Sequence, residues 1–367
     1  EVSNLKDSGS INLVIDKDTL VKKNSSSKVT TIYTDILVDT KGPVITYKGR
    51  ENTNKNIKYA TNKDTITLKL EAKDESAIIG EIDDIKVYVD GEEKEVIKTI
   101  TKNGNNYEIK ISNVEGNGKL TIVIPENEIQ DEIGNGNKET IITPGITIDN
   151  KLPTIVYNAN GSENYSTYYD VEINVIDSET GIDNETLKYK WNTKAEGEGE
   201  TSFSNNSTVR IEKVTGDYYL IGEACDNAGN CTKEISKVYK LSNEGPSIVL
   251  GTNGNTSYSQ SASTKITVTS TTGTLDNNSL LYIVSKDKTA VPTISYANNE
   301  TIKIDNLTGD YYIIAKACDN IGNCTTITSK AYHLDNEGPT IVYGTNGNTS
   351  YSQSASTKIT ITDNNEI

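Results

Sequence analysis

The sequence contains no methionine and only one phenylalanine, one tryptophan and one histidine, whereas it contains 21 tyrosines. Hydrophobic residues make up 34% of the chain, which is below the usual share for a globular protein. They nevertheless recur in short alternating runs, and this pattern argues against long disordered segments. Asparagine and glycine disfavour helices, whereas tyrosine, threonine, isoleucine and valine favour strands. The composition therefore predicts an all-β chain.

Positive charge is scarce, because 36 lysines and arginines face 52 aspartates and glutamates and leave a formal net charge of −16. A nucleic-acid partner is not expected, since surfaces that bind nucleic acid are basic. The acidity suits either the solvation of a long, thin protein or a surface that recruits cations. Long apolar runs are missing too, so no membrane span is expected, and no signal peptide or lipidation motif is visible in these residues.

Two near-identical stretches that lie 93 residues apart show that the chain is built from repeated modules. They read Ala-Cys-Asp-Asn-x-Gly-Asn-Cys at 224–231 and 317–324. Residues 243–267 and 336–360 match at 23 of 25 positions, which indicates recent duplication within an array of adjustable length. Alternating apolar runs between turn signals predict about seven short strands in a complete module, which is typical of a β-sandwich.

Proline-containing links divide the sequence into three complete modules and two partial ones. The complete modules are expected at residues 39–148, 149–240 and 241–333. Residues 1–38 match the C-terminal part of a module, and residues 334–367 repeat the opening of one. A boundary introduced by expression or processing is the simplest explanation of the partial modules. Self-assembly, in which one chain completes a module of the next, is the alternative.

Four cysteines form two Cys-x5-Cys pairs, Cys225 with Cys231 and Cys318 with Cys324. Alternation along the preceding strand places them on the solvent face of a hairpin, outside the core. A hairpin loop of this size brings the two sulfurs within bonding distance, so we expect two local disulfides formed in an oxidising compartment. Free thiols are the alternative. The spacing and the single histidine, His333, disfavour a redox-active or zinc-binding pair.

The single tryptophan, Trp191, alternates in step with Leu187 and Tyr189. This pattern favours a place in the core over an exposed ring that stacks on sugars. Paired carboxylates are too common in so acidic a chain to be distinguished by spacing. We therefore expect no catalytic residues and no enzyme activity.

The repeated pattern resembles the bacterial immunoglobulin-like (Big-type) domains of large surface proteins. The likeness rests on Gly-x-Tyr-x-Leu/Ile, then Ala-x-Asp-x-x-Gly-Asn, then a strand and Asn-x-Gly-Pro-x-Ile, and it covers almost the whole chain. It implies tandem immunoglobulin-like β-sandwich modules in an elongated, extracellular protein of adhesin or stalk type. The chain departs from the family's common pattern in its paired cysteines, and it shows no wall-sorting motif.

These features predict a non-catalytic stalk or filament segment at a bacterial cell surface, which spaces or presents an adhesive region. Its partners would be the neighbouring modules of the same long chain. Modules that bind a host glycan or protein, and accessory modules of a large secreted enzyme, are the alternatives. The near-identity of the last two repeats favours spacing, because duplicates that stay alike provide length more than new recognition.

Acidic residues in loops near the links are candidate ligands for calcium, the only cofactor that the sequence suggests. In a sandwich, the link, the loop after the second strand and the loop before the last strand lie at the same pole. That pole would gather carboxylates, which calcium prefers. The candidates are Asp39, Asp74, Glu75 and Asp131 in the first complete module, and Asp149, Asp177, Glu179 and Asp226 in the second. The third module has Ser242 and a threonine-rich loop instead, so calcium is not expected there.

Overall fold

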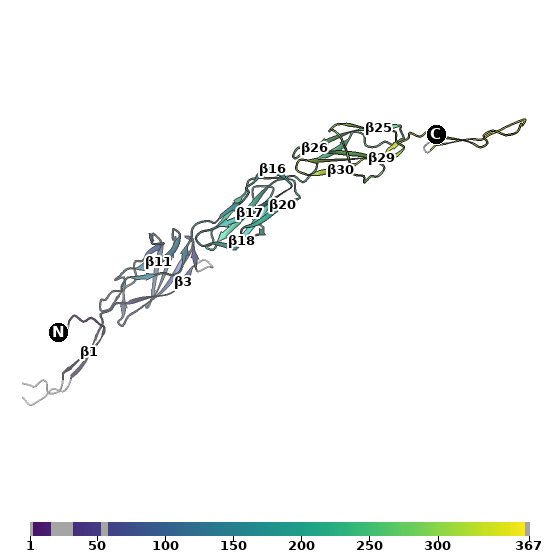
Figure 1. The fold of residues 1–367 in the computed structure, drawn as a ribbon. Helices are drawn as coiled ribbons and strands as arrows, with labels where there is room; N and C mark the ends of the chain where they lie inside the picture. Colours follow the sequence, from purple (N-terminus) through teal and green to yellow (C-terminus); the bar gives the residue numbers. More distant parts are fainter. Residues whose placement is uncertain (1–2, 16–31, 53–57, 364–367) are drawn as a thin grey trace, which may run out of the picture.

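The computed structural model describes residues 3–15, 32–52 and 58–363, which form strands and loops without a helix. Three β-sandwiches lie end to end in an elongated array, and a two-stranded hairpin extends beyond each end of it (Figure 1). We call the sandwiches module 1 (39–148), module 2 (149–241) and module 3 (242–334), because Leu241 and Leu334 belong to the cores of modules 2 and 3. The described part of the chain has no helix long and apolar enough to cross a membrane. The all-β prediction is confirmed.

Module 1 consists of two main sheets that pack face to face. Its strands are β3 (Val44–Asn52), β4 (Tyr59–Ala60), β5 (Thr65–Lys73), β6 (Ile78–Ile79), β7 (Lys86–Val89), β8 (Glu92–Lys94), β9 (Ile97–Asn103), β10 (Asn106–Ser112), β11 (Gly118–Ile124), β12 (Gln130–Asp131), β13 (Thr140–Ile142) and β14 (Thr147–Ile148). One sheet has the order β3-β5-β10-β9, and the other has the order β4-β14-β11-β7-β8 with β13 also paired to β11. A short β12–β6 pair closes one end.

Module 2 has a three-stranded sheet and a larger sheet. Its strands are β15 (Thr154–Tyr157), β16 (Ser162–Ser166), β17 (Tyr168–Ile176), β18 (Ile182–Asn192), β19 (Thr201–Ser202), β20 (Ser207–Glu212), β21 (Gly216–Asp226), β22 (Cys231–Ile235) and β23 (Tyr239–Leu241). The smaller sheet has the order β15-β17-β20, and the larger has the order β16-β23-β21-β18-β19 with β22 also paired to β21.

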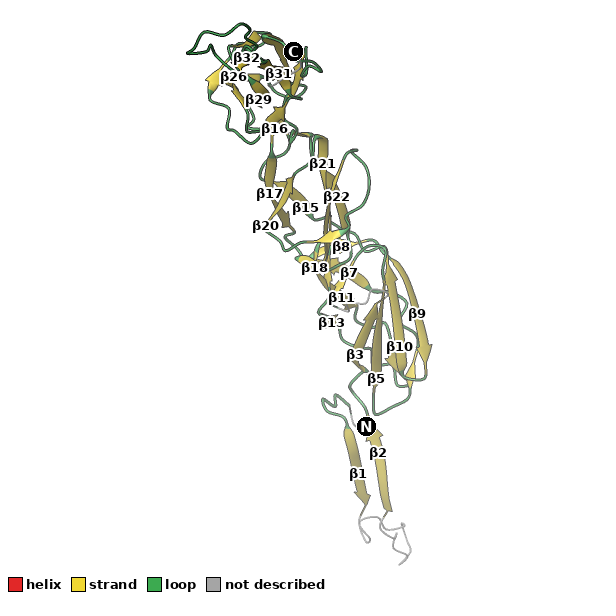
Figure 2. Ribbon diagram, turned by 90° about the vertical axis from the view of Figure 1, so that its right-hand side faces the viewer, coloured by secondary structure: helices red, strands yellow, loops and turns green. Residues whose placement is uncertain are grey.

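Module 3 repeats the topology of module 2 except that a single bridge replaces β16, and its sheets are β24-β25-β28 and β27-β26-β29-β30 with β31 paired to β29. In Figure 2, its labelled strands β26, β29 and β31 lie at the opposite end of the array from β1 and β2. Its strands are β24 (Ser247–Leu250), β25 (Ser261–Thr269), β26 (Leu275–Ser285), β27 (Ile294–Ser295), β28 (Thr301–Asp305), β29 (Gly309–Asp319), β30 (Cys324–Thr328) and β31 (Tyr332–Leu334). The terminal hairpins pair β1 (Gly9–Ile15) with β2 (Ile32–Val38), and β32 (Thr340–Tyr343) with β33 (Ile359–Thr362). Parts of the expected partial modules, at 1–2, 16–31 and 364–367, lie outside the described residues.

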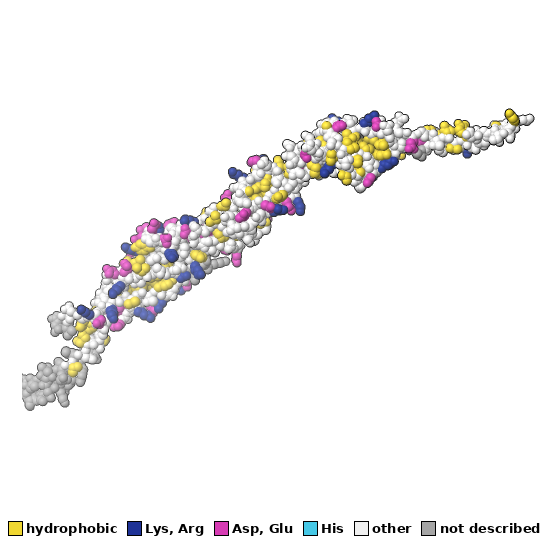
Figure 3. Space-filling model, viewed as in Figure 1, with side chains coloured by type: hydrophobic (Ala, Val, Ile, Leu, Met, Phe, Trp, Pro, Cys, Tyr) yellow, Lys and Arg dark blue, Asp and Glu magenta, His cyan; other side chains and the backbone are white. Residues whose placement is uncertain are grey.

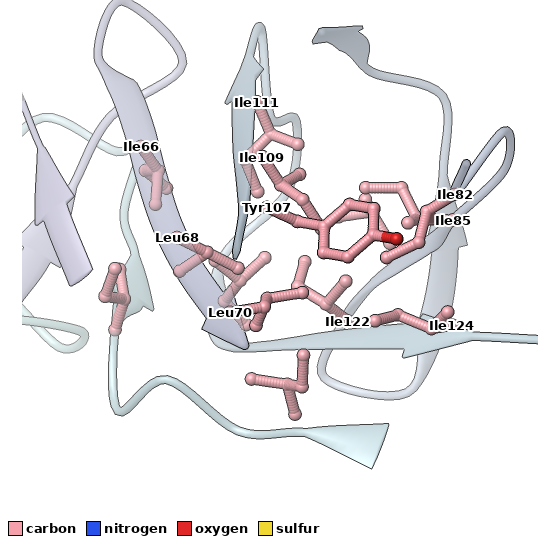
Figure 4. Close-up of a cluster of buried hydrophobic side chains, with 14 of the residues drawn as sticks. Ile66, Leu68, Leu70, Ile82, Ile85, Tyr107, Ile109, Ile111, Ile122 and Ile124 are labelled. Carbon is pink, nitrogen blue, oxygen red and sulfur yellow. The ribbon is translucent and has the colours of Figure 1, made fainter. Parts of the chain in front are cut away.

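Each module has its own hydrophobic core, and the alternation along its strands explains why. Every second residue of β5, β10 and β11 points between the sheets of module 1 (Figure 4). These side chains are almost entirely buried: Ile66, Leu68, Leu70, Tyr107, Ile109, Ile111, Ile122 and Ile124. Burial of one such aliphatic side chain contributes about 1.5–3 kcal/mol. Acidic and basic side chains of the three modules are interspersed on the outer surface (Figure 3).

A fully buried tyrosine occupies equivalent positions in modules 2 and 3. Tyr239 and Tyr332 each donate a hydrogen bond through the hydroxyl group to a backbone carbonyl, of Ala159 and Thr252 respectively. Trp191 packs against the core of module 2 in an edge-to-face arrangement with Tyr239, and the ring centroids are 5.1 Å apart. Trp191 is therefore partly buried on the core side of its strand, as the alternation predicts.

A short parallel pairing joins an early segment of each module to its last strand. In module 1, β4 runs parallel to β14, and in module 2, β16 runs parallel to β23. Module 3 has a single parallel bridge between Ser259 and Leu334. All other strand pairings of the described residues are antiparallel, apart from these three.

The structure joins Cys225 to Cys231 and Cys318 to Cys324, as the hairpin spacing predicts. The cysteines are the last cross-strand pair of the β21–β22 and β29–β30 hairpins. The strand face that carries them is less exposed than the alternation predicts, because Ile221 and Ile314 on that face are buried and Cys318 is only 9% exposed. In module 2, the loop at Gly197 lies close to the side chain of Ile221 and covers it.

Module 1 carries Gln130 and Gly136 at the positions of the two cysteines. A Cβ atom at Gly136 would lie 2.1 Å from the side-chain oxygen of Asn127 and 3.1 Å from its Cα atom. The space that the second cysteine needs is therefore absent from module 1.

Reduction of the disulfides should destabilise modules 2 and 3 and leave module 1 unchanged. Each bond closes a loop of six-residue separation, for which the chain-entropy estimate is about 2 kcal/mol. For domains of this size that corresponds to a fall in Tm of about 10 °C. Calorimetry with and without a reductant measures it, and Trp191 fluorescence isolates module 2. The double variant Cys225→Ala/Cys231→Ala should remove the response of module 2 only; an unchanged midpoint in the parent chain would contradict the expectation.

Candidate functional site: the joints between modules

Each module is entered through a five-residue link, at 39–43, 149–153 and 242–246, and a fourth link at 335–339 leads to β32. We call the first residue of each link the bridging residue, because it lies between two consecutive structural units. A link and the loops that contact it form a joint, and the joints are numbered in the order of the links. The bridging residues are Asp39, Asp149, Ser242 and Asp335. Asp149 and Ser242 are completely buried although both side chains are polar.

The bridging residue binds the module that follows it through its side chain and its carbonyl oxygen. The carboxylate of Asp149 accepts a hydrogen bond of 2.7 Å from the Thr180 hydroxyl group, and its carbonyl accepts one of 3.0 Å from the Asn230 side chain. At the next joint, Ser242 and Thr272 share a hydroxyl–hydroxyl hydrogen bond, and the Asn323 side chain donates to the Ser242 carbonyl at 3.0 Å. The same contacts join Asp39 to Ser76 and Asn135.

The bridging residue also completes the module that precedes it. The backbone N–H of Asp149 donates to the carbonyl of Ala60 in module 1 at 2.9 Å. The backbone N–H groups of Ser242 and Asp335 donate to the carbonyls of Ser166 and Ser259, each at 3.0 Å. These bonds extend the parallel pairings by one residue, so the last bond of one module comes from the residue that opens the next.

The second residue of three links is an asparagine that binds back to the preceding module, and we call it the anchor asparagine. The Asn243 side chain donates to the carbonyls of Thr167 and Val214, at 2.9 and 2.7 Å. Asn150 donates to the carbonyls of Val114 and Gly116, and Asn336 donates to those of Gln260 and Leu307. The link is thus held from both sides. The sequence did not predict these contacts, although an asparagine recurs as the second link residue at positions 150, 243 and 336.

An aspartate organises the polar loop that receives each link, at 131–135, 226–230 and 319–323. One carboxylate oxygen of Asp226 accepts hydrogen bonds from three backbone N–H groups of its own loop at 2.7–2.9 Å, and the other accepts one from the Asn230 side chain. Asp131 and Asp319 make the equivalent contacts. Gly229 permits the turn, because its φ of 97° is accessible to glycine but strained for other residues.

Three carboxylates meet at the first joint and three at the second. Asp39, Asp74 and Asp131 form the first cluster, and Asp149, Asp177 and Asp226 form the second; in each, one carboxylate oxygen per residue lies within 4.8 Å of the others. Two oxygens that bind one calcium ion at about 2.4 Å are at most about 4.8 Å apart, so this spacing fits a shared ion. The sequence predicted that these six residues would gather at the two entry poles.

The negative charges within each cluster repel one another. Burial raises the pKa of Asp226, and the charge of Asp149 raises it further against the hydrogen bonds of the polar loop. Burial likewise raises the pKa of Asp74, with Asp39 and Asp131 adding to it. A carboxylate with a raised pKa costs stability at neutral pH, and this cost disappears as the pH falls through the folded-state pKa. A bound cation would remove the same cost without protonation.

Two other predicted ligands lie outside the clusters. Glu75 is exposed, and Glu179 pairs with Lys151, with 2.9 Å between the carboxylate oxygen and the ammonium nitrogen. Glu75 follows Asp74 by one position and Glu179 follows Asp177 by two, and neither joins its cluster of three carboxylates. Sequence position alone could not separate them from Asp74 and Asp177.

The third joint keeps the same geometry with one carboxylate in place of three. Ser242 stands where Asp149 stands in the second joint, and Ser270 stands where Asp177 stands, so Asp319 is the only carboxylate left. Hydroxyl groups take over the contacts, because Ser242 bonds Thr272 and Ser270 donates to the Thr272 carbonyl at 2.8 Å. At the third joint, hydrogen bonds between neutral groups therefore replace two of the three carboxylates.

No protein-family model matches the chain, and no curated protein matches it. Among solved structures, it is similar to a Ca2+-stabilised ice-binding adhesin of an Antarctic bacterium, at 13% identity over 86% of this chain and 80% of that one, with a TM-score of 0.41. It is also similar to part of a 1.5-MDa bacterial ice-binding adhesin (13% identity, 82% of this chain, 100% of that one, TM-score 0.37). A third similarity is to three domains of the bacteriophage RB49 outer capsid protein Hoc (12% identity, 80% of this chain, 99% of that one, TM-score 0.30). The structure itself shows a tandem array of β-sandwiches.

Proposed function

We propose that this chain is a non-catalytic stalk segment of a bacterial extracellular surface protein, which spaces or presents an adhesive region. The observation that carries the proposal is the construction of the links. Anchor asparagines bind each of the last three links to the module before it, and bridging residues bind the first three links to the module after it. A link that is bonded on both sides acts as a stiff connection rather than as a tether.

Two disulfides support an extracellular location, because such bonds persist in oxidising compartments. The interspersed charges of the surface keep a long array soluble. We further propose that the two carboxylate clusters bind calcium, which would stiffen the first and second joints. The third joint would remain independent of calcium.

Small-angle X-ray scattering of the whole chain tests the stalk. The longest strands have 11 residues and span about 36 Å, so three modules in line extend over about 110 Å. A rod of that length has a radius of gyration of about 30 Å or more, whereas a compact chain of 367 residues has about 20 Å.

The variant Asn243→Ala should free the link between modules 2 and 3 and shorten the mean end-to-end distance. Asn184→Ala, which alters an exposed asparagine on module 2, serves as the matched control and should leave the scattering unchanged. A radius of gyration near the compact value, or an unchanged curve for Asn243→Ala, would contradict a stalk stiffened by its links.

A further inference from the structure

We propose that the bridging residues couple the opening of neighbouring modules, so that the end of one module is held closed by the folded loops of the next. This inference concerns how the modules communicate and does not depend on calcium or on the stalk function. It starts from the position of one residue, Asp149, whose backbone belongs to the pairing of module 1 and whose side chain belongs to module 2.

Three atoms of Asp149 bind two different modules. Its N–H donates to Ala60 of module 1, while its carbonyl and carboxylate oxygens accept from Asn230 and Thr180 of module 2. Because the residue is completely buried, none of these bonds can be exchanged freely for a bond to water. Opening the end of module 1 therefore either pulls Asp149 out of module 2 or moves β4 away from a residue that module 2 holds in place.

The same arrangement at the third joint shows that the contacts do not depend on a carboxylate. Ser242 is also completely buried, donates its N–H to Ser166 of module 2, and bonds to Thr272 and Asn323 of module 3. The residue type changes from aspartate to serine, yet the backbone bond and both forward contacts remain. The coupling is thus a property of the joint itself.

The pairing that the bridging residue extends is short, and this makes the coupling effective. In module 1 it consists of β4 and β14 with two residues each, and the N–H groups of Thr147 and Asp149 donate to the carbonyls of Lys58 and Ala60. A pairing of two residues opens locally with little cost unless its end is fixed. Module 2 supplies that fixed end through Thr180 and Asn230. By linkage, a closed pairing in module 1 must stabilise the loops of module 2 to the same degree.

Hydrogen–deuterium exchange on the whole chain, resolved by residue, tests the coupling. The variant Thr180→Val keeps the shape of the side chain and removes the hydroxyl group that binds Asp149. We expect the amides of Thr147 and Asp149, both in the pairing of module 1, to exchange about tenfold faster. The exchange rates of the β10 amides in the core of the same module should change by less than twofold. The control Thr208→Val, on an exposed face of module 2, should change neither group.

The variant Thr272→Val repeats the test where no carboxylate cluster exists. It should accelerate hydrogen exchange at the Ser242 amide, which bonds to module 2, by about tenfold. The exchange rate of the Asp149 amide should stay unchanged. If Thr180→Val instead unfolds module 2, as Trp191 fluorescence would show, the amides of Thr147 and Asp149 must still accelerate. Unchanged exchange at Asp149 and Ser242 in their respective variants, or an equal effect of Thr208→Val, would overturn the coupling, whatever the scattering shows about the stalk.

Discussion

Replacement of Asp226 by alanine should lower the free energy of unfolding of module 2 by about 3 kcal/mol, since it removes the carboxylate acceptor of one buried and two partly buried backbone N–H groups. The carboxylate of Asp226 accepts from the N–H groups of Ala228, Gly229 and Asn230 and from the Asn230 side chain. Without it, the polar loop loses its internal support, and Asn230 can no longer be held toward the Asp149 carbonyl. The effect should reach the second joint as well as the module.

Trp191 makes this experiment specific, because the only tryptophan of the chain packs against the core of module 2. Denaturant unfolding followed by its fluorescence, in the presence of a chelator, reports module 2 without a contribution from bound cations. The conservative variant Asp226→Asn keeps one oxygen acceptor and should lose less than the alanine variant. Asp217→Ala, at an exposed position of the same module, should stay within about 0.5 kcal/mol of the parent. Equal effects of Asp217→Ala and Asp226→Ala would show that the loop contacts are energetically unimportant.

Calcium should raise the thermal unfolding midpoints (Tm) of modules 1 and 2 and leave that of module 3 unchanged. A ligand at one hundred times its Kd stabilises the folded state by about 2.7 kcal/mol. For domains of this size the corresponding rise in Tm is about 10 °C or more. Sites that resemble those of extracellular modules have Kd values of about 10⁻⁴–10⁻³ M, so about 10–100 mM calcium reaches this ratio. Calorimetry with calcium and then with excess chelator measures the shift.

The joints supply matched controls for the calcium experiment. Asp177→Asn keeps the oxygen that accepts the loop N–H groups but removes one charge, so module 2 alone should lose its response. The double variant Ser242→Asp/Ser270→Asp places carboxylates at the third joint, and module 3 should then gain a response. The fourth link shows the same pair of residue types, with Asp335 and Asp363 in a stretch otherwise almost identical to that of module 3. If neither calcium nor chelator changes the thermal unfolding midpoints of modules 1 and 2, the metal sites are refuted.

The strands and the entry poles followed from local patterns in the sequence, whereas the contacts of the links did not. Alternation located β5, β10 and β11, because each strand covers a core with every second residue. The meeting of Asp149, Asp177 and Asp226 followed from sandwich topology, which brings the link and two loops to one pole. Both deductions depend on neighbours in sequence or on a fold that many sequences share.

The anchor asparagines could not be deduced in that way. The side chain of Asn243 bridges the carbonyls of Thr167 and Val214, which lie 76 and 29 residues away in the sequence. Asparagine is common in this chain, and no local pattern distinguishes an amide that bonds two distant carbonyls from one that is solvated. The same limit applies to Glu179, whose pairing with Lys151 depends on the direction of its side chain.

The parallel pairings decide how an array of this kind responds to a pulling force. Tension along the chain draws β16 toward the entry of module 2 and draws β23 toward its exit. Because the two strands are parallel and neighbouring, these forces slide them past each other along their length. The hydrogen bonds of Ser162 to Val238 and of Ser242 to Ser166 are then loaded together, rather than broken one after another as at the open end of a hairpin. The contact between this early segment and the last strand yields only when all of these bonds fail at once.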